Sequence, residues 1–150
     1  MIINLIGQPG SGKTTISKLL QLEIPKSISI DGDEIRDIFN NKDYSEVGRR
    51  KNIQNAYNIA LFLEKKGFNP IISLVSPYRD LREWLKEQTE VFEFYIYTSD
   101  IRGREKFFVE NYEIPIDNYT SIDTTNKEPS DVVENQIKDI IRYETSKDKV

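Results

Sequence analysis

Residues 7–14 read Gly-Gln-Pro-Gly-Ser-Gly-Lys-Thr, which satisfies the G-x-x-x-x-G-K-[ST] pattern of a phosphate-binding loop. The loop follows an apolar run at Ile2–Ile6 and opens a helical pattern at Lys13–Leu22. A phosphate-binding loop needs this strand–loop–helix context, because the helix N-terminus supplies part of the positive field. The context favours a nucleoside triphosphate site over the alternative, a glycine-rich turn that binds nothing.

The residues of this loop have distinct predicted roles toward a nucleoside triphosphate. Gly10 and Gly12 allow backbone N–H groups to turn inward around the β-phosphate. Lys13 is predicted to reach the β- and γ-phosphates as a catalytic residue, and Thr14 to bind Mg²⁺ through its hydroxyl. Thr15 is predicted to contact the α-phosphate. The predicted nucleotide-binding residues of the loop are Gly7, Gly10, Ser11, Gly12, Lys13, Thr14 and Thr15.

Short β-branched runs alternate with longer helical stretches along the rest of the chain, which is typical of a parallel α/β domain. Strands are predicted at Ile2–Ile6, Ser27–Ile30, Asn69–Val75, Val91–Tyr97 and Thr120–Asp123. Helices are predicted at Lys13–Leu22, Asp33–Phe39, Ser45 to about Lys66, Pro77–Glu87, Asp100–Phe108 and Ser130–Tyr143. A lid or loop is expected at about residues 102–119, and a frayed tail at residues 144–150. These elements predict one P-loop NTPase domain over residues 1–150, with a five-stranded parallel sheet flanked by helices.

Composition excludes several kinds of chemistry. The 150 residues contain no histidine and no cysteine, which removes imidazole bases, thiol nucleophiles and the usual zinc sites. A formal net charge of -4 disfavours broad nucleic-acid binding, which needs a basic surface. The apolar runs have the length of strands and are too short to span a bilayer. Because an apolar strand starts at Ile2, we expect no targeting segment, no membrane association and a cytoplasmic location.

Two aspartates follow the second predicted strand, in the sequence Asp31-Gly32-Asp33-Glu34-Ile35-Arg36. The carboxyl ends of parallel strands meet at one edge of the sheet, where ligands of α/β proteins bind. Asp31 and Asp33 are therefore predicted catalytic residues, with Asp31 placed to accept a proton from an acceptor hydroxyl or to help bind Mg²⁺. Arg36, one helical turn beyond Asp33, is placed to hold an anion. The alternative is that an aspartate merely caps the following helix.

A guanine-binding signature is missing from the chain. GTPases usually carry N-K-x-D, whereas this chain has Asn126-Lys127-Glu128-Pro129. Together with the acidic segment, this difference favours a nucleotide-kinase-like enzyme that uses ATP.

Two further groups are predicted to meet at the same edge of the sheet. Arg49 and Asn52 extend an apolar helical stripe, which suits a helix start that projects beyond the sheet into a cleft. Ser76 and Pro77 end the third predicted strand. The alternative for Arg49 is a surface ion pair with Glu46.

In order along the chain, the segments GQPGSGKTT, DGDEIR, YSEVGRRKN, LVSPYR, NYEIP and IDTT resemble the adenylylsulfate (APS) kinase family. The resemblance covers about the whole chain. It implies a P-loop kinase fold, ATP and Mg²⁺ as cofactors, transfer of phosphate from ATP to the 3′-hydroxyl of APS to give PAPS, and a homodimer. It places Asp31 near the metal, with Thr14, and near the acceptor hydroxyl. The substrate residues that it implies are Asp33, Arg36, Phe39, Tyr44, Arg49, Asn52, Val75, Ser76 and Pro77, with the arginines on the phosphosulfate and Tyr44 on the adenine.

The lid region departs from the family pattern. The family's lid motifs with a lysine and a second stacking aromatic residue are cut down here to residues 102–111. Phe107 or Phe108 is the candidate replacement for the aromatic residue. Arg102, Arg104 or Lys106 is the candidate for the cation, with Arg104 assigned to ATP binding.

Three alternatives remain open from the sequence. One is another small-molecule kinase, and one is a polynucleotide 5′-hydroxyl kinase, whose motif also has D-x-x-R spacing. The third is a nucleotide-binding module without catalytic activity. The acidic net charge counts against the polynucleotide kinase.

Overall fold

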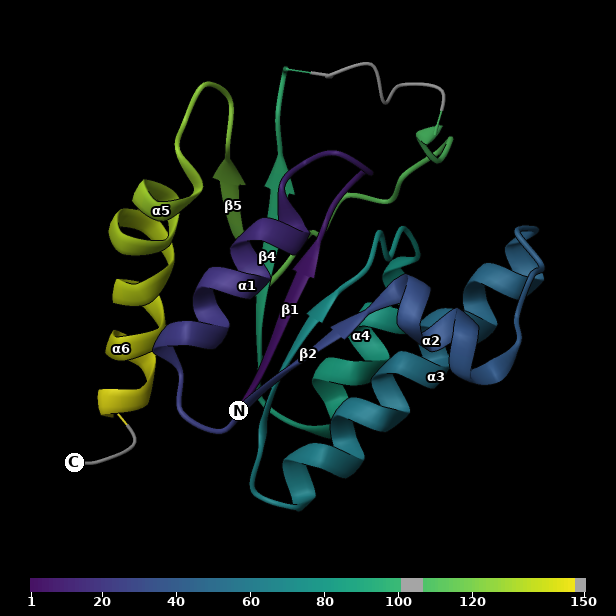
Figure 1. Cartoon of the computed structure of the whole chain (residues 1–150), viewed down its shortest axis with the longest axis horizontal. Coiled ribbons are helices and arrows are strands. Elements are labelled where there is room, and N and C mark those ends of the chain that lie inside the picture. The colour runs from purple at the N-terminus through teal and green to yellow at the C-terminus, as the bar shows by residue number, and fades with distance from the viewer. Residues whose placement is uncertain (101–106, 148–150) are drawn as a thin grey trace.

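The structure, a computed structural model, describes residues 1–100 and 107–147. Its sheet has five parallel strands in the order β2-β3-β1-β4-β5, which confirms the predicted fold class (Figure 1). The strands are β1 (Ile2–Ile6), β2 (Ser27–Asp31), β3 (Asn69–Ser73), β4 (Val91–Tyr97) and β5 (Thr120–Asp123). The central strand β1 lies between β3 and β4. At its carboxyl end, the loops that follow neighbouring strands lead to opposite sides of the sheet. Sheets of this kind bind ligands at such a point.

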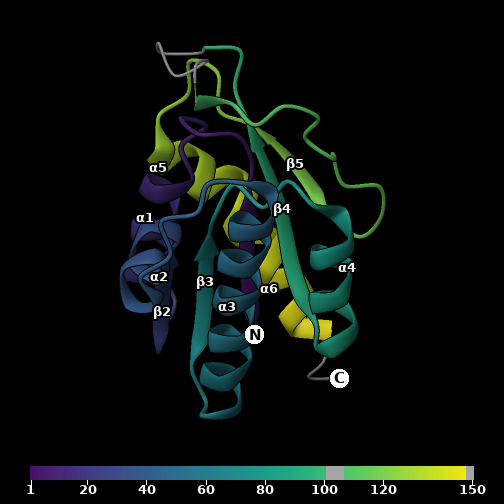
Figure 2. The same ribbon diagram turned by 90° about the vertical axis from the view of Figure 1, so that its right-hand side faces the viewer.

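Helices cover both faces of the sheet, as Figure 2 shows for α3 and α4 on one face. The helices are α1 (Lys13–Glu23), α2 (Gly32–Phe39), α3 (Glu46–Lys65), α4 (Arg79–Gln88), α5 (Pro129–Val132), the π-helical turn η2 (Val133–Ile137) and α6 (Lys138–Lys147). Alternate residues of β1 face opposite layers. Ile3 and Leu5 pack with α1 and the C-terminal helices, whereas Ile2 packs with the layer that contains α3 and α4. Burial on both faces explains why the strands are continuous apolar runs.

The long helix α3 begins and ends as predicted to within a residue. Ser45 occupies its N-cap position, although its side chain makes no capping hydrogen bond. Gly67 has φ +92° and donates its N–H to the carbonyl of Glu64 at 3.0 Å. Phe68 donates to Leu63 at 3.1 Å, which completes a glycine-terminated helix end.

Some predicted boundaries are wrong. The third strand ends at Ser73 and not at Val75, and α4 begins at Arg79 and not at Pro77. The intervening residues form a turn in which Ser76 adopts φ +46°, a conformation that neither a strand nor a helix contains. The last helix starts at Pro129 and runs to Lys147, beyond its predicted end at Tyr143. Most of the predicted helix at 100–108 lies outside the described residues.

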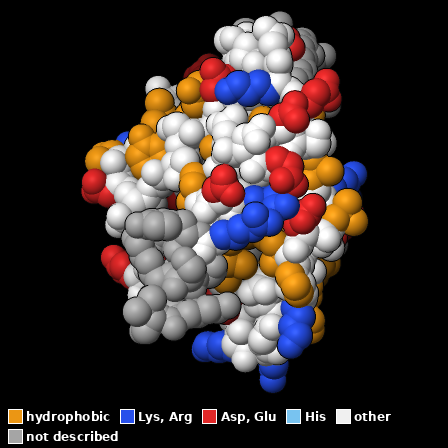
Figure 3. Space-filling view, turned by 90° about the vertical axis from the view of Figure 1, so that its left-hand side faces the viewer, with side chains coloured by type: hydrophobic (Ala, Val, Ile, Leu, Met, Phe, Trp, Pro, Cys, Tyr) orange, Lys and Arg blue, Asp and Glu red, His pale blue; other side chains and the backbone are white. Residues whose placement is uncertain are grey.

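The surface formed by α1, α5 and α6 carries both signs of charge, interspersed (Figure 3). Lys138 illustrates the pattern, since it pairs with Glu134 at 2.9 Å and with Glu23 at 3.2 Å. The described residues of this face therefore do not form the single-sign basic surface that binds nucleic acid. None of the helices described here is long and apolar enough to cross a membrane.

Candidate active site

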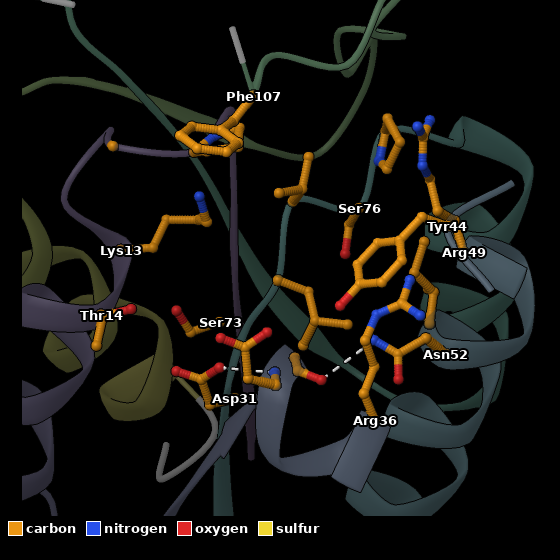
Figure 4. Close-up of a pocket in the computed structure, with 18 residues that line it drawn as sticks. Lys13, Thr14, Asp31, Arg36, Tyr44, Arg49, Asn52, Ser73, Ser76 and Phe107 are labelled. Carbon is orange, nitrogen blue, oxygen red and sulfur yellow. Dashed lines mark hydrogen bonds between the residues drawn. The ribbon is translucent and has the colours of Figure 1, made fainter. Parts of the chain in front are cut away.

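A cavity of about 590 Å³ opens at the carboxyl edge of the sheet, where the phosphate-binding loop faces the β2–α2 turn (Figure 4). It also reaches the start of α3 and the β3–α4 turn. Its lining consists of Pro9, Gly10, Lys13, Thr14, Asp31, Gly32, Asp33, Arg36, Tyr44, Arg49, Asn52, Ile53, Ser73, Leu74, Val75, Ser76, Pro77 and Phe107. Most of the predicted site residues thus lie together in one cavity.

The phosphate-binding loop wraps around its own lysine. The Lys13 Nζ donates to the carbonyls of Gly7 and Gln8, both at 2.8 Å, and lies 3.3 Å from the Ser11 Oγ. Burial lowers the pKa of Lys13 from 10.5 to about 7, while the charge of Asp31 acts in the opposite direction. Backbone oxygens therefore hold the ammonium group at the wall of the cavity. An anion in the cavity can compete with these oxygens for the ammonium group.

Backbone conformation explains the two glycines at the ends of the loop. Gly7 has φ +148° and lies so close to the carbonyl oxygen of Ile96 that a Cβ would collide with it. Gly12 has φ +104° and occupies the N-cap position of α1, so the first helical N–H groups face the cavity side of the loop. Thr14 is exposed and lines the cavity, whereas Thr15 is exposed and does not.

Asp31 combines the predicted placement with the alternative capping role. Its Oδ1 accepts the backbone N–H of Asp33 at 3.0 Å and so caps α2 (Figure 4). Both aspartates also line the cavity with Lys13 and Thr14. The cap fixes the carboxylate in orientation, which leaves its second oxygen available to the cavity.

Arg36 and Tyr44 form one wall of the other half of the cavity. The guanidinium of Arg36 stacks on the ring of Tyr44, 4.0 Å from its centroid. The same guanidinium donates to the carbonyls of Asn41 at 3.1 Å and Asp43 at 3.0 Å. Arg36 thereby holds the loop that carries Tyr44 in place, in addition to lining the cavity.

The start of α3 contributes Arg49 and Asn52, as the apolar stripe predicted. The carboxylate of Glu46 pairs with Arg50 at 3.0 Å and not with Arg49, so the surface-pair alternative is wrong. Asn52 is buried and its Nδ2 donates to the carbonyl of Gly32 at 3.3 Å, which ties α3 to the acidic turn. The Oδ1 of Asn52 is buried and has no partner among the described residues.

The β3–α4 turn is supported from behind by residues that the sequence did not single out. The guanidinium of Arg82 donates to the carbonyl of Ser76 at 2.6 Å and to the carbonyl of Glu113. Arg82 is fully buried, with its Nε 3.6 Å from the carboxylate of Glu93. Burial raises the pKa of Glu93, while Lys86 and Arg82 oppose that shift. Arg82 lies on α4 and Glu93 on β4, so their pairing spans two different elements and leaves no periodic signal in the sequence.

Not every predicted site residue lines the cavity: among the described residues the exceptions are Gly7, Ser11, Gly12, Thr15 and Phe39. Phe39 is half exposed at the end of α2 and does not line it. Arg104 lies outside the described residues, as do Arg102 and Lys106. Of the two candidate aromatic replacements, Phe107 lines the cavity and Phe108 does not.

Comparisons with known proteins agree with this geometry. A family model described as adenylylsulphate kinase matches residues 1–133. The adenylyl-sulfate kinase of Staphylococcus carnosus is 28% identical, over 95% of this chain and 83% of that protein. The cytidine diphosphoramidate kinase of Campylobacter jejuni is 29% identical, over 85% of this chain and 81% of that protein. The structure of the Mycobacterium tuberculosis APS kinase in complex with AMPPNP and APS superposes with a TM-score of 0.76 at 18% identity, over 94% of this chain and 96% of that chain, which shows a common fold.

Proposed function

The chain belongs to the adenylylsulphate kinase family, and from that membership we propose that it transfers the γ-phosphoryl group of ATP to the 3′-hydroxyl of APS, giving PAPS and ADP. The observation that carries the proposal is the juxtaposition of two half-sites in one cavity. Lys13 and Thr14 lie on one side of the cavity. Arg36 and Arg49 lie on the other side, which we call the acceptor wall, and Asp31 lies between the two.

For the proposed reaction, the protein has to position ATP and the acceptor and to offset the negative charge of the phosphates. The acceptor oxygen forms a bond to the γ-phosphorus while the bond from that phosphorus to the bridging oxygen of ADP breaks. Asp31 is proposed to take the proton of the acceptor hydroxyl. Lys13 and the backbone N–H groups at the start of α1 are proposed to offset the negative charge on the transferred group and on the leaving phosphate.

Hard oxygen donors are present for a magnesium ion. Thr14 and Asp31, which would hold it, line the same cavity. Within the described ranges, no group of three or more carboxylates converges on a point, so the remaining ligands would be phosphate oxygens and water, as Mg²⁺ usually prefers. When bound, Mg²⁺ would neutralise charge on the phosphates.

The acceptor wall suits a nucleotide that carries an anionic tail. Arg49 and Arg36 offer planar cations for the phosphosulfate. Tyr44 is 64% exposed, and Arg36 stacks on one face of its ring, so the other face is proposed to stack against an adenine. We also propose that the enzyme works in the cytoplasm; the homodimer implied by the resemblance stays a prediction.

A parallel acceptor assay tests this proposal. Purified protein with ATP and Mg²⁺ is offered APS, cytidine diphosphoramidate, nucleosides and 5′-hydroxyl oligonucleotides, and ADP and the phosphorylated product are both quantified. We expect turnover with APS and none with the Lys13→Met variant. Turnover with another acceptor and none with APS would overturn the proposed substrate. ATP binding without turnover on any acceptor would support the non-catalytic module.

A further inference from the structure

The side chain of Gln8 joins the phosphate-binding loop to a segment 101 residues away. Its Nε2 donates to the carbonyl of Val109 at 2.9 Å, and its Oε1 accepts the N–H of Val109 at 2.9 Å. The amide therefore satisfies both backbone groups of a single residue. The carbonyl of Gln8 meanwhile accepts the ammonium of Lys13 at 2.8 Å. Gln8 thus contacts both the lysine of the phosphate-binding loop and Val109.

Val109 lies two residues after Phe107, whose ring borders the cavity near Lys13 in Figure 4. Gln8 itself does not line the cavity. Any effect of its side chain on a ligand must therefore act through the residues that it holds. Two residues of backbone leave little freedom between the anchored Val109 and the ring, so the anchor limits where the ring can lie.

The following part of the segment is fixed by different contacts. Tyr112 donates its hydroxyl to the carbonyl of Val75 at 2.5 Å, and the N–H of Glu113 donates to the carbonyl of Pro77 at 3.0 Å. These bonds tie residues 112–113 to the β3–α4 turn. Loss of the Gln8 side chain would leave them in place, so its effect should be confined to the end of the segment that carries Phe107.

We propose that Gln8 is a positioning residue that anchors Val109 and thereby holds Phe107 over the cavity, where the ring helps to bind the acceptor. An uncharged ring suits the planar part of a nucleotide and not its phosphates, and Phe107 lines the same cavity as Tyr44 and Arg49, the residues proposed to bind the acceptor. The phosphate contacts come from Lys13 and the loop backbone, which do not need the Gln8 side chain. This inference rests on the proposed function of the same site.

The kinetic test uses Gln8→Leu, which puts an apolar side chain of similar size in place of the amide and removes both hydrogen bonds. Two such bonds contribute roughly 1 kcal/mol each, so we expect the KM for APS to rise by about 5- to 30-fold. The kcat and the Kd for ATP should change less than about twofold. Gln88→Leu is the matched control, because Gln88 is an exposed residue on α4 that bonds only locally, to Trp84, in the described structure.

A double-mutant cycle separates positioning from general destabilisation. In a Phe107→Ala background, adding Gln8→Leu should change the KM for APS by less than about twofold, because the ring that Gln8 positions is already absent. Independent, multiplicative effects would overturn the inference. So would an unchanged KM in Gln8→Leu, or an equal loss of affinity for ATP and APS.

Amide hydrogen exchange supplies a readout that needs no acceptor. In Gln8→Leu, the Val109 N–H should exchange at least tenfold faster, whereas the Glu113 N–H should keep its rate. If the wild-type protein does not turn over APS, the proposed function fails. The exchange measurement still shows whether the side chain of Gln8 anchors Val109. Unchanged exchange at Val109 overturns the inference whatever the acceptor.

Discussion

Nucleotide binding is expected to take up a proton, because Lys13 titrates near neutral pH in the free protein. Only 8% of Lys13 is exposed, and burial lowers its pKa to about 7. A bound triphosphate places negative charge beside the Nζ and raises this pKa, since an opposite charge favours the protonated form. Above pH 7, a neutral Lys13 must therefore gain a proton as ATP binds.

The size of the effect follows from the pKa. With a pKa of about 7, the protonated fraction of Lys13 falls about eightfold between pH 7.5 and pH 8.5. If ATP binds only the charged form, its association constant falls by the same factor, which is about 1.2 kcal/mol. The proton uptake should lie between about 0.8 and 1 per nucleotide over this interval.

Isothermal titration calorimetry measures both quantities. ATP with Mg²⁺ is titrated at the two pH values, without acceptor, in two buffers that differ in ionisation enthalpy. The Lys13→Met variant is the control: its residual binding should be independent of both pH and buffer, and it should transfer no phosphate. A wild-type binding enthalpy that does not depend on the buffer, with equal affinity at the two pH values, would refute the reasoning.

The same shift affects folding stability with a defined sign. The pKa of Lys13 in the folded protein, about 7, lies below its ordinary value of 10.5. Unfolding therefore takes up a proton between about pH 7 and 10.5, and the contribution of this group to the free energy of unfolding rises with pH over that window. Saturating ATP should abolish this contribution, because the complex holds Lys13 in its charged form.

Three substitutions test the other roles. Asp31→Asn should lower kcat by about 100-fold or more, the usual contribution of a general base, with a much smaller change in the Kd for ATP; equal losses in kinetics and calorimetry would contradict the assigned role. Arg49→Ala should raise the KM for APS by about 10- to 100-fold and leave ATP binding unchanged, whereas its neighbour variant Arg50→Ala, which breaks exposed ion pairs, should leave both constants nearly unchanged. Arg82→Met should lower the free energy of unfolding by about 3–5 kcal/mol in urea titrations, because it removes a buried cation beside Glu93; a cost below about 1 kcal/mol would show that the pair does not support the fold.

The nucleotide half of the site was predictable from the sequence because its geometry is local. A strand, a turn with positive φ at Gly10 and Gly12, and a helix follow one another within the span from Ile2 to Glu23. Such φ values favour glycine, so the glycine positions in the sequence predict the backbone conformation directly. Asp31 was predictable for a related reason, since it ends a strand and caps the next helix within two residues.

The β3–α4 turn was predicted wrongly because its conformation depends on distant contacts. Leu74 and Val75 continue the apolar run and read as strand, yet the ladder ends at Ser73. The carbonyl of Val75 is used instead by the N–H of Gly7 at 3.3 Å and by the hydroxyl of Tyr112. The positive φ of Ser76 could not be predicted, because serine usually adopts negative φ values. Local patterns cannot report bonds to residues tens of positions away.

The two halves of the site therefore differ in what holds them. The conformation of the phosphate-binding half follows from backbone geometry within one short segment, and distant residues support it through a few hydrogen bonds, such as that from the Thr124 hydroxyl to the carbonyl of Ser11. The proposed acceptor half draws on side chains of α2, α3 and the β3–α4 turn that line the cavity, together with Phe107, which we propose is positioned by Gln8. Relatives of similar identity, 28% and 29%, accordingly carry the names of kinases with different acceptors, adenylyl sulfate and cytidine diphosphoramidate. Overall sequence identity therefore does not tell these acceptors apart. On the proposed assignment, exchanging Arg49, Tyr44 and Phe107 is expected to change which acceptor the enzyme uses.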